Sequence, residues 1–336
     1  MATVSSLSLC ARITLDLHSP NNEGTEGNQQ QTRMVHIIDQ RGRRAVVNGI
    51  SGDMFKHILV EHLIPLIEAV GQPLSPGARA HDADRINALN PAFVDFCESE
   101  QEFMVDGRPE RRMAKESEIL TKMLTECSLT DLAGALVTRG RAIGRKSVVE
   151  FGWVVGLPED GAGQPLTITE QYFHVKYAPE GRGAAAGDET VTGKQAIFHR
   201  PASSGIYALI ANLDLYRIGL NDISRQYVVE PAGRQTRARA LIQALASTLL
   251  KPSGAQRNTQ NPHIVACEGV VAVASTSLPA PTVSPLNDGY RQQIAQSAAV
   301  LNQIRAGAVT AQAFDTLPEG IGVLAEIAKD VEVPKG

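Results

Sequence analysis

The sequence predicts an α+β fold, because segments with the two-residue alternation of strands are interspersed with segments that have the 3.6-residue period of helices. Residues 4–17 place apolar side chains at every second position, which is typical of a half-buried strand. Residues 234–250 place Leu and Ile at helical spacing on one face. With 336 residues, of which 43% are hydrophobic, the chain is long enough to bury a substantial core.

A turn, a hairpin and a helix are expected after the first strand. Residues 33–38 and 45–48 alternate like two paired strands. Ser51 is expected to begin a helix that continues to about residue 70, because its hydroxyl can accept a hydrogen bond from a free amide of the first turn. Pro65 is expected to kink or divide this helix.

The middle of the chain is expected to hold an insertion and a protruding hairpin. Residues 82–140 are expected to be helical, with the clearest helix at 113–126. Residues 147–157 predict one buried strand, since they are rich in Val and aromatic residues. Residues 167–177 and 194–199 predict the two strands of a long hairpin with a Gly/Ala-rich tip.

The last third predicts a strand at 205–215, a helix at 234–250, a strand at 263–275, and helices near 286–305 and 321–328. Without the insertions, the order is strand, helix, strand, strand, helix, strand. This is the ferredoxin-like pattern of RNA-recognition folds. Unrelated α+β domains share that order, so order alone does not identify a function.

The charge balance is slightly acidic, with a formal net charge of −4, which is unlike most nucleic-acid-binding proteins. Basic residues are nevertheless concentrated at 33–56, 139–146 and 234–257. Segregated basic stretches fit a protein that binds a polyanion on one face, with ordinary solvated charge as the alternative. On charge alone, the predicted contacts are Arg41, Arg43 and Arg44.

The sequence offers no pattern for catalysis or metal binding. The four cysteines form no CxxC pair and match no zinc spacing, so we expect buried thiols in a reducing cytosol. The eight histidines show no metal-ligand or triad grouping. No segment predicts a signal peptide or a membrane span. We therefore expect a cytoplasmic protein that has no cofactor and is not an enzyme.

Two segments have the composition of phosphate-binding sites. At 47–57, a Gly-flanked turn begins a helix, and free amides there can bind phosphate with help from Ser51, Lys56 and His57. At 251–258, amides near Gly254 could form an anion-binding concavity. An ordinary helix cap and an ordinary solvated loop are the respective alternatives.

Five segments together carry a family resemblance, and one of them contains the motif Asn48-Gly49-Ile50-Ser51-Gly52-Asp53. In chain order, and with this motif included, the segments are 15–28, 48–58, 145–152, 203–215 and 254–257. They resemble the DevR-type CRISPR-associated autoregulator family, the backbone subunit of type I Cascade surveillance complexes. Each motif is modest alone, but five in the family's order are specific.

The resemblance implies an RNA-recognition-like palm with an inserted helical finger region and a protruding thumb hairpin. Copies of the chain would stack head to tail along one CRISPR RNA, with other Cascade subunits and target DNA as further partners and no membrane. The implied division is 1–70 for the first part of the palm, 71–146 for the finger region, 147–171 for palm strands, 172–203 for the thumb, 204–280 for the second half of the palm and 281–336 for C-terminal helices.

Carried over position by position, the resemblance places RNA contacts in two segments. The implied contacts are Asn22, Ser51, Asp53, Lys56 and His57, followed by Ser253, Gly254, Gln256 and Arg257. Phe173, Lys194, His199 and Arg200 fall in the thumb. The thumb tip, residues 181–187, matches no family pattern.

Two other functions remain open at this point. Backbone subunits of related type III complexes cut target RNA with an acidic residue near the thumb, a role that Asp188 or Glu189 could take. The family name also suggests a transcriptional autoregulator, although no helix-turn-helix with a basic recognition helix is evident.

Overall fold

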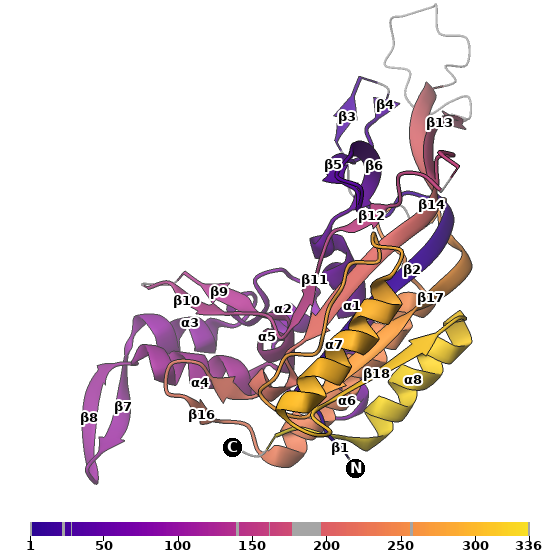
Figure 1. Cartoon of the computed structure of the whole chain (residues 1–336). Helices are drawn as coiled ribbons and strands as arrows, with labels where there is room; N and C mark the ends of the chain where they lie inside the picture. The colour runs from indigo at the N-terminus through magenta and orange to yellow at the C-terminus, as the bar shows by residue number, and fades with distance from the viewer. Residues whose placement is uncertain are drawn as a thin grey trace, which may run out of the picture.

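The computed structural model describes residues 2–21, 24–27, 29–138, 141–160, 162–176, 196–255 and 258–334. Its centre is an antiparallel sheet in which β2 lies between β17 and β14, and β11 pairs with the other edge of β14 (Figure 1). These strands are β2 (Ser6–His18), β11 (Val149–Phe151), β14 (Ala196–Leu213) and β17 (His263–Ala274). Mixed α+β structure is confirmed.

Further strands extend this sheet on both sides. On one side β17 pairs with β18 (Val309–Phe314). On the other side, β14 is followed by β12 (Val154–Gly156), β6 (Arg44–Ile50) and β5 (Met34–Ile38). The first half of β14 pairs with β13 (Thr167–Lys176) in a hairpin that projects beyond the sheet (Figure 1). The predicted hairpin at 33–48 is confirmed.

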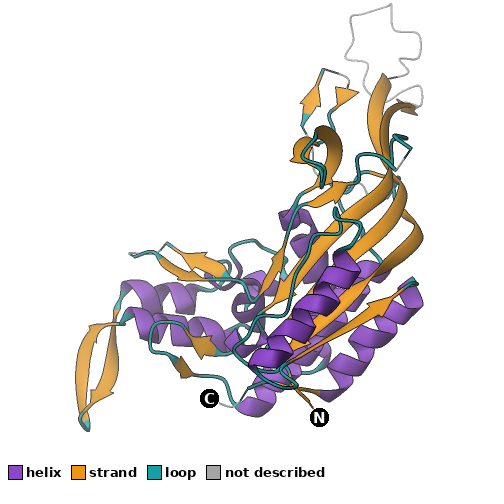
Figure 2. Cartoon of the chain, viewed as in Figure 1, coloured by secondary structure: helices purple, strands orange, loops and turns teal. Residues whose placement is uncertain are grey.

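Helices cover both faces of the sheet (Figure 2). On one face α1 (Gly52–Ala69) and α6 (Pro231–Leu250) pack against each other, and α8 (Leu317–Asp330) packs on α6. The buried cluster between them includes Leu7, Leu9 and Ile13 of β2, Leu59 of α1 and Leu245 of α6. On the opposite face α7 (Tyr290–Ile304) buries Cys10, Val270 and Ile294. Helix α1 continues through Pro65, so the expected division is wrong.

The inserted region combines helices with two hairpins. Its helices are α2 (Pro76–Arg79), η1 (Arg85–Asn87), α3 (Pro91–Glu98), α4 (Glu116–Glu126) and α5 (Ser128–Ala133). Its strands are β7 (Glu100–Val105), β8 (Arg108–Met113), β9 (Ala135–Val137) and β10 (Ile143–Arg145). The β7–β8 hairpin projects from the end of the molecule opposite β13 (Figure 1).

The expectation that residues 82–140 are helical is wrong at the strands β7, β8 and β9. Asp106 and Gly107 both have positive φ, 49° and 77°, which is the conformation of a two-residue hairpin turn. The Arg112 guanidinium lies 4.0 Å from the centre of the Phe103 ring on the facing strand. The Asp-Gly pair was the local signal for a hairpin.

The predicted strand at 147–157 is interrupted. Phe151 lies opposite Ala211 of β14 and Val155 lies opposite Ala208, so four steps on one strand match three on the other. This extra residue is a β-bulge. It separates β11 from β12 and leaves the Trp153 side chain 48% exposed.

The remaining short elements are β1 (Ala2–Thr3), β3 (Thr25–Glu26), β4 (Gln29–Gln30), η2 (Leu215–Arg217), β15 (Leu220–Asn221), β16 (Gln226–Tyr227) and β19 (Val331–Glu332). The two expected C-terminal helices are present, with strand β18 between them. All four cysteines are buried and free. Within the ranges given above, no helix has the length and apolar character needed to cross a membrane.

A buried cluster of charges joins α5 and β10 to residues 217–222 and to α6. The Asp131 carboxylate of α5 accepts hydrogen bonds from Arg145 at 2.7 Å, from Arg237 at 2.8 Å and from the Gly219 amide. Arg145 also donates to Asp222 at 2.8 Å and to backbone carbonyls. Two of the basic stretches in the sequence therefore supply structural arginines.

Candidate nucleic-acid interface

The start of α1 is held in place by two polar side chains. The Ser51 hydroxyl accepts a hydrogen bond from the Met54 amide at 3.2 Å, as expected for a helix cap. The buried Asn21 side chain donates to the Gly49 carbonyl at 2.8 Å and accepts from the Ser51 amide at 3.2 Å. Gly52 has no room for a Cβ, which would lie 2.5 Å from the Phe151 carbonyl oxygen.

The loop after α6, at residues 251–255, packs against Pro20 and against α1. The Ala255 amide donates to the Pro20 carbonyl at 2.8 Å. A Cβ on Gly254 would lie 2.3 Å from that same carbonyl oxygen, so only glycine permits this approach. The His62 ring of α1 makes a 3.0 Å hydrogen bond with the Lys251 carbonyl.

These contacts bring three separate sequence segments to one place. Residues 18–21, 49–57 and 251–255 meet at the end of β2 from which the β13–β14 hairpin projects (Figure 1). The hairpin joins the same cluster, since Arg200 donates to the Thr259 hydroxyl at 3.0 Å and Gln260 donates to the Pro201 carbonyl at 2.8 Å.

Two adjoining grooves run beside the start of α1. One, of about 450 Å³, is lined on one side by Ser51, Asp53 and Lys56 and on the other by Lys146 and Trp153. The second, of about 520 Å³, shares Lys56 and Lys146 with the first and adds Arg85. The line of cations along the two grooves is Arg33, Lys56, Lys146 and Arg85.

The electrostatics of the grooves favour an anion near Lys56. Burial lowers the pKa of the Lys56 ammonium, and the nearby Arg85 guanidinium lowers it further. The Asp53 and Glu150 carboxylates partly offset this. Burial likewise lowers the pKa of Arg85. A phosphate between these groups would relieve the repulsion between the two cations.

Asp53 and His57 lie on the exposed side of α1. Asp53 stands in the first turn, where a carboxylate interacts favourably with the amide end of the helix. His57 lies 3.7 Å from the Glu61 carboxylate, one turn further along. Ser253 is half-buried in the loop beside Gly254. Asn22, Gln256 and Arg257 lie outside the described residues.

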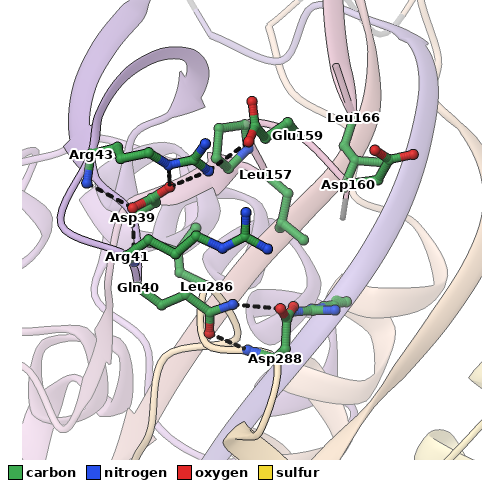
Figure 3. A pocket seen from close by; sticks show the side chains of 12 residues that line it. Asp39, Gln40, Arg41, Arg43, Leu157, Glu159, Asp160, Leu166, Leu286 and Asp288 are labelled. Carbon is green, nitrogen blue, oxygen red and sulfur yellow. Dashed lines mark hydrogen bonds and ion pairs between the residues drawn. The ribbon is translucent and has the colours of Figure 1, made fainter. Parts of the chain in front are cut away.

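The arginines predicted from charge lie on the turn between β5 and β6, at a separate polar pocket of about 250 Å³ (Figure 3). Arg43 forms ion pairs with Asp39 at 2.7 Å and with Glu159 at 2.5 Å. Arg41 points into the pocket, near Asp288, whereas Arg44 is exposed at the start of β6. The charge of Arg43 is therefore already compensated, and that of Arg41 is more available.

Asp288 anchors that pocket to the C-terminal part of the chain. Its carboxylate accepts hydrogen bonds from Arg12 at 2.8 Å and from Gln40 at 2.5 Å, and these contacts lower the pKa of Asp288. Figure 3 shows the Gln40 side chain between the turn and Asp288. The β5–β6 turn is thereby tied to the segment before α7.

Two of the predicted thumb residues form a ring pair in which Phe173 is exposed and His199 is half-buried. Phe173 of β13 lies opposite His199 of β14, with ring centres 4.5 Å apart, and the Phe173 side chain is 74% exposed. Arg200 lies at the base of the hairpin, against the loop after α6. Lys194 and residues 181–187 lie outside the described residues.

Sequence reasoning did not select Arg33, Arg85, Lys146 or Trp153 as site residues. The spacing of these four in the chain gives no sign that they share a groove. Trp153 carried one available signal: it is the only tryptophan and follows Gly152 inside a run of strand-forming residues. A glycine inside such a run often marks a bulge.

The structure is similar to a chain of a solved CRISPR RNA-guided surveillance complex, pre-nicking, with a TM-score of 0.52, 12% identity, and coverage of 96% of this chain and 100% of that chain. This likeness shows a common fold. A chain of a CRISPR RNA-guided surveillance complex gives a TM-score of 0.42 at 13% identity, covering 96% of this chain and 99% of that chain.

The chain belongs to the family described as CRISPR-associated negative auto-regulator DevR/Csa2, whose model matches residues 9–295. The family resemblance found in the sequence is thereby confirmed. The comparison with curated proteins found no match.

Proposed function

We propose that the chain is a non-catalytic, CRISPR RNA-binding backbone subunit of a type I Cascade surveillance complex. Copies would assemble along the guide RNA, with other subunits at the ends, and leave guide bases free to pair with target DNA. The observation that carries this proposal is the convergence of residues 18–21, 49–57 and 251–255. The family resemblance implies RNA contacts within or directly beside these segments, and here hydrogen bonds join the segments at one end of β2.

The palm and thumb belong to the same proposal. The strand order β17-β2-β14-β11, all antiparallel, with α1 and α6 on one face, supports a ferredoxin-like palm. The β13–β14 hairpin would be the thumb, and the exposed Phe173 ring, packed on His199, would press on RNA held by a neighbouring copy. The insertion at 71–146 would be the finger region, and the divisions at 147–171, 172–203, 204–280 and 281–336 follow the same scheme.

The packing of α7 supports recognition of the RNA backbone. RNA-recognition modules commonly stack bases on the sheet face opposite their two helices. Here α7 covers that face and buries Cys10 and Val270. Binding would therefore use backbone amides, Ser51, Lys56 and His57 at the start of α1, and the Ser253–Gly254 loop, with Asp53 supporting the helix end. At the β5–β6 turn, Arg41 and Arg44 would contribute more than Arg43, which is ion-paired with Asp39 and Glu159.

The proposal is tested with the purified chain and fluorescent single-stranded RNA of increasing length. We expect binding that weakens with salt at a slope of about −0.7 per phosphate contact, without base preference. Sedimentation should show particle mass rising stepwise with RNA length. A chain that binds no single-stranded RNA at low salt, and yields no RNA when co-expressed with a CRISPR array, would contradict the proposal.

The family description supplies a second candidate, because it names a negative auto-regulator. Competition between labelled single-stranded RNA and duplex DNA from the chain's own promoter separates the two. Tighter, sequence-specific binding to the duplex would favour autoregulation. The ribonuclease alternative is checked by adding target RNA complementary to the guide RNA, because target RNA that stays intact after incubation with the RNA-loaded chain contradicts it. Asp188 and Glu189 lie outside the described residues.

A further inference from the structure

The β-bulge between β11 and β12 presents an aromatic side chain to solvent. Trp153 is 48% exposed, although all three residues of β12, directly after it, are buried. The Gly152 amide donates to the Ile210 carbonyl at 3.0 Å, which fixes the backbone just before Trp153. The backbone on both sides of Trp153 is therefore held by the sheet, by Gly152 on one side and by Val154 opposite Ile50 on the other.

The surroundings of Trp153 are polar and cationic. The Arg33 guanidinium lies 5.5 Å from the centre of its ring, within the range of a cation–π contact. The groove of about 450 Å³ beside the ring is also lined by Ser51, Lys56 and Lys146. Its carboxylates are Asp53 and Glu150, and Glu150 is paired with Lys146 at 2.6 Å. Lys146 and Glu150 thus compensate each other, and Lys56 and Asp53 are the other groove charges at the start of α1.

The groove has the dimensions and groups of a nucleotide site. A flat aromatic ring can stack on any base, whereas cations beside it can hold the adjoining phosphate. Small-ligand sites commonly enclose about 300–1,000 Å³, a range that includes this groove. An apolar protein segment would instead take water away from the Lys56 ammonium without supplying a counter-charge.

We propose that Trp153 is a stacking platform for one unpaired base of a bound single-stranded RNA, with Arg33 as its positioning residue. The phosphate of that nucleotide would lie toward Lys56 and the start of α1. This inference rests on the proposed RNA-binding function. It adds a base contact at the bulge, because α7 covers the sheet face on which RNA-recognition modules commonly stack bases. Since stacking is tolerant of base identity, the contact would anchor RNA without reading its sequence.

The chain reports on this contact directly, because Trp153 is its only tryptophan. The full-length protein is titrated with oligoadenylate while tryptophan emission is recorded, and binding is followed separately by anisotropy of a dye on the RNA. We expect emission to be quenched in step with binding. The matched probe is an abasic ribose-phosphate oligomer of equal length, which should bind with little quenching.

Two variants extend the test. Trp153→Ala should weaken oligoadenylate binding by about 5- to 150-fold and leave binding of the abasic oligomer nearly unchanged. Trp153→Phe keeps an aromatic ring and should retain most of the affinity, which guards against a folding defect in the alanine variant. Arg33→Ala should reduce quenching at saturation.

Each contrary result is distinct. Binding by anisotropy with no quenching and no effect of Trp153→Ala would overturn the stacking contact and leave the proposed function standing. No binding of either oligomer would remove the proposed function itself. If Trp153→Ala instead abolished self-association in sedimentation without changing RNA affinity, Trp153 would belong to a protein interface and the inference would be wrong.

Discussion

Two basic regions of this chain have opposite roles in the structure. Arg145 and Arg237 come from basic stretches of the sequence, yet their side chains are 0% and 2% exposed and converge on Asp131. Lys56 and Lys146 line grooves open to solvent, beside the start of α1. The difference lies in the supply of internal acceptors: each buried arginine is satisfied by a carboxylate and by carbonyl oxygens.

The comparison teaches that a basic stretch does not by itself indicate a nucleic-acid interface. A guanidinium can be buried only when its donors are paired, and Arg145 donates five hydrogen bonds to four residues. Lys56, by contrast, is partly desolvated next to Arg85, and this lowers its pKa. Such a group gains from an external anion.

The largest expected effect comes from removing the shared acceptor. Asp131→Ala leaves Arg145 and Arg237 buried without their counter-charge, which should destabilise the chain by about 3–5 kcal/mol. Urea unfolding followed by circular dichroism measures this loss. Asp222→Ala is the matched control, since that carboxylate is 31% exposed and should be less costly to remove. If Asp131→Ala kept normal stability but bound RNA less tightly, Arg145 and Arg237 would belong to the RNA interface, and the contrast between the two basic regions would be wrong.

A buried titratable side chain, His18, tests the same comparison between buried and solvent-facing charged groups. His18 at the end of β2 is 1% exposed, packs against Tyr207 with ring centres 4.9 Å apart, and finds no hydrogen-bond partner in the described part of the chain. Burial lowers its pKa from 6.5 to about 3. The unfolded chain therefore binds a proton that the folded chain rejects, and stability falls as the pH drops below about 6.5.

The His18 contribution should be about 2 kcal/mol between pH 7 and pH 5, and should be absent in His18→Gln. The measurement is the free energy of unfolding at both pH values for both proteins. The His18→Gln variant is the reference for the wild-type protein, because the two proteins share all other titrating groups. An equal pH dependence in the two would show that His18 is protonated in the folded chain.

Removing a groove cation should affect binding and spare stability. Lys56→Ala should weaken binding to all RNA sequences by roughly tenfold and make the salt slope less negative by about 0.7. Lys329→Ala removes the same charge from the exposed side of α8 and should change neither quantity. Anisotropy titrations at several salt concentrations measure both. A loss confined to one RNA sequence would contradict a backbone contact.

The smallest effect is expected at the β5–β6 turn. Arg43→Ala should leave RNA affinity nearly unchanged, because Asp39 and Glu159 already compensate its charge. Arg41→Ala should have the greater effect of the two, since Arg41 points into the pocket of Figure 3. Side-by-side anisotropy titrations compare them, and the reverse order would show that the ion pairs of Arg43 open when RNA binds.

Much of the architecture could be predicted from local patterns. Alternation identified β2, helical spacing identified α6, and the hydroxyl of Ser51 identified the start of α1. Prediction failed at the β7–β8 hairpin, where the Asp106–Gly107 turn outweighed the helical expectation, and at Gly152–Trp153, where the bulge depends on pairing with β14. Both errors concern pairing between strands, which periodicity within one segment does not describe.

The sequence by itself determined the family, since five short motifs in order suffice, and it predicted that residues 47–57 and 251–258 belong to the interface. Only the tertiary structure decided which cations are available. Arg145 and Arg237 lie 14 and 106 residues from Asp131, so their burial depends on contacts that no local pattern contains. The same holds for Arg33, Lys56 and Trp153, which the fold brings to one groove. Charge is a property of the residue, but access to it depends on what packs around it.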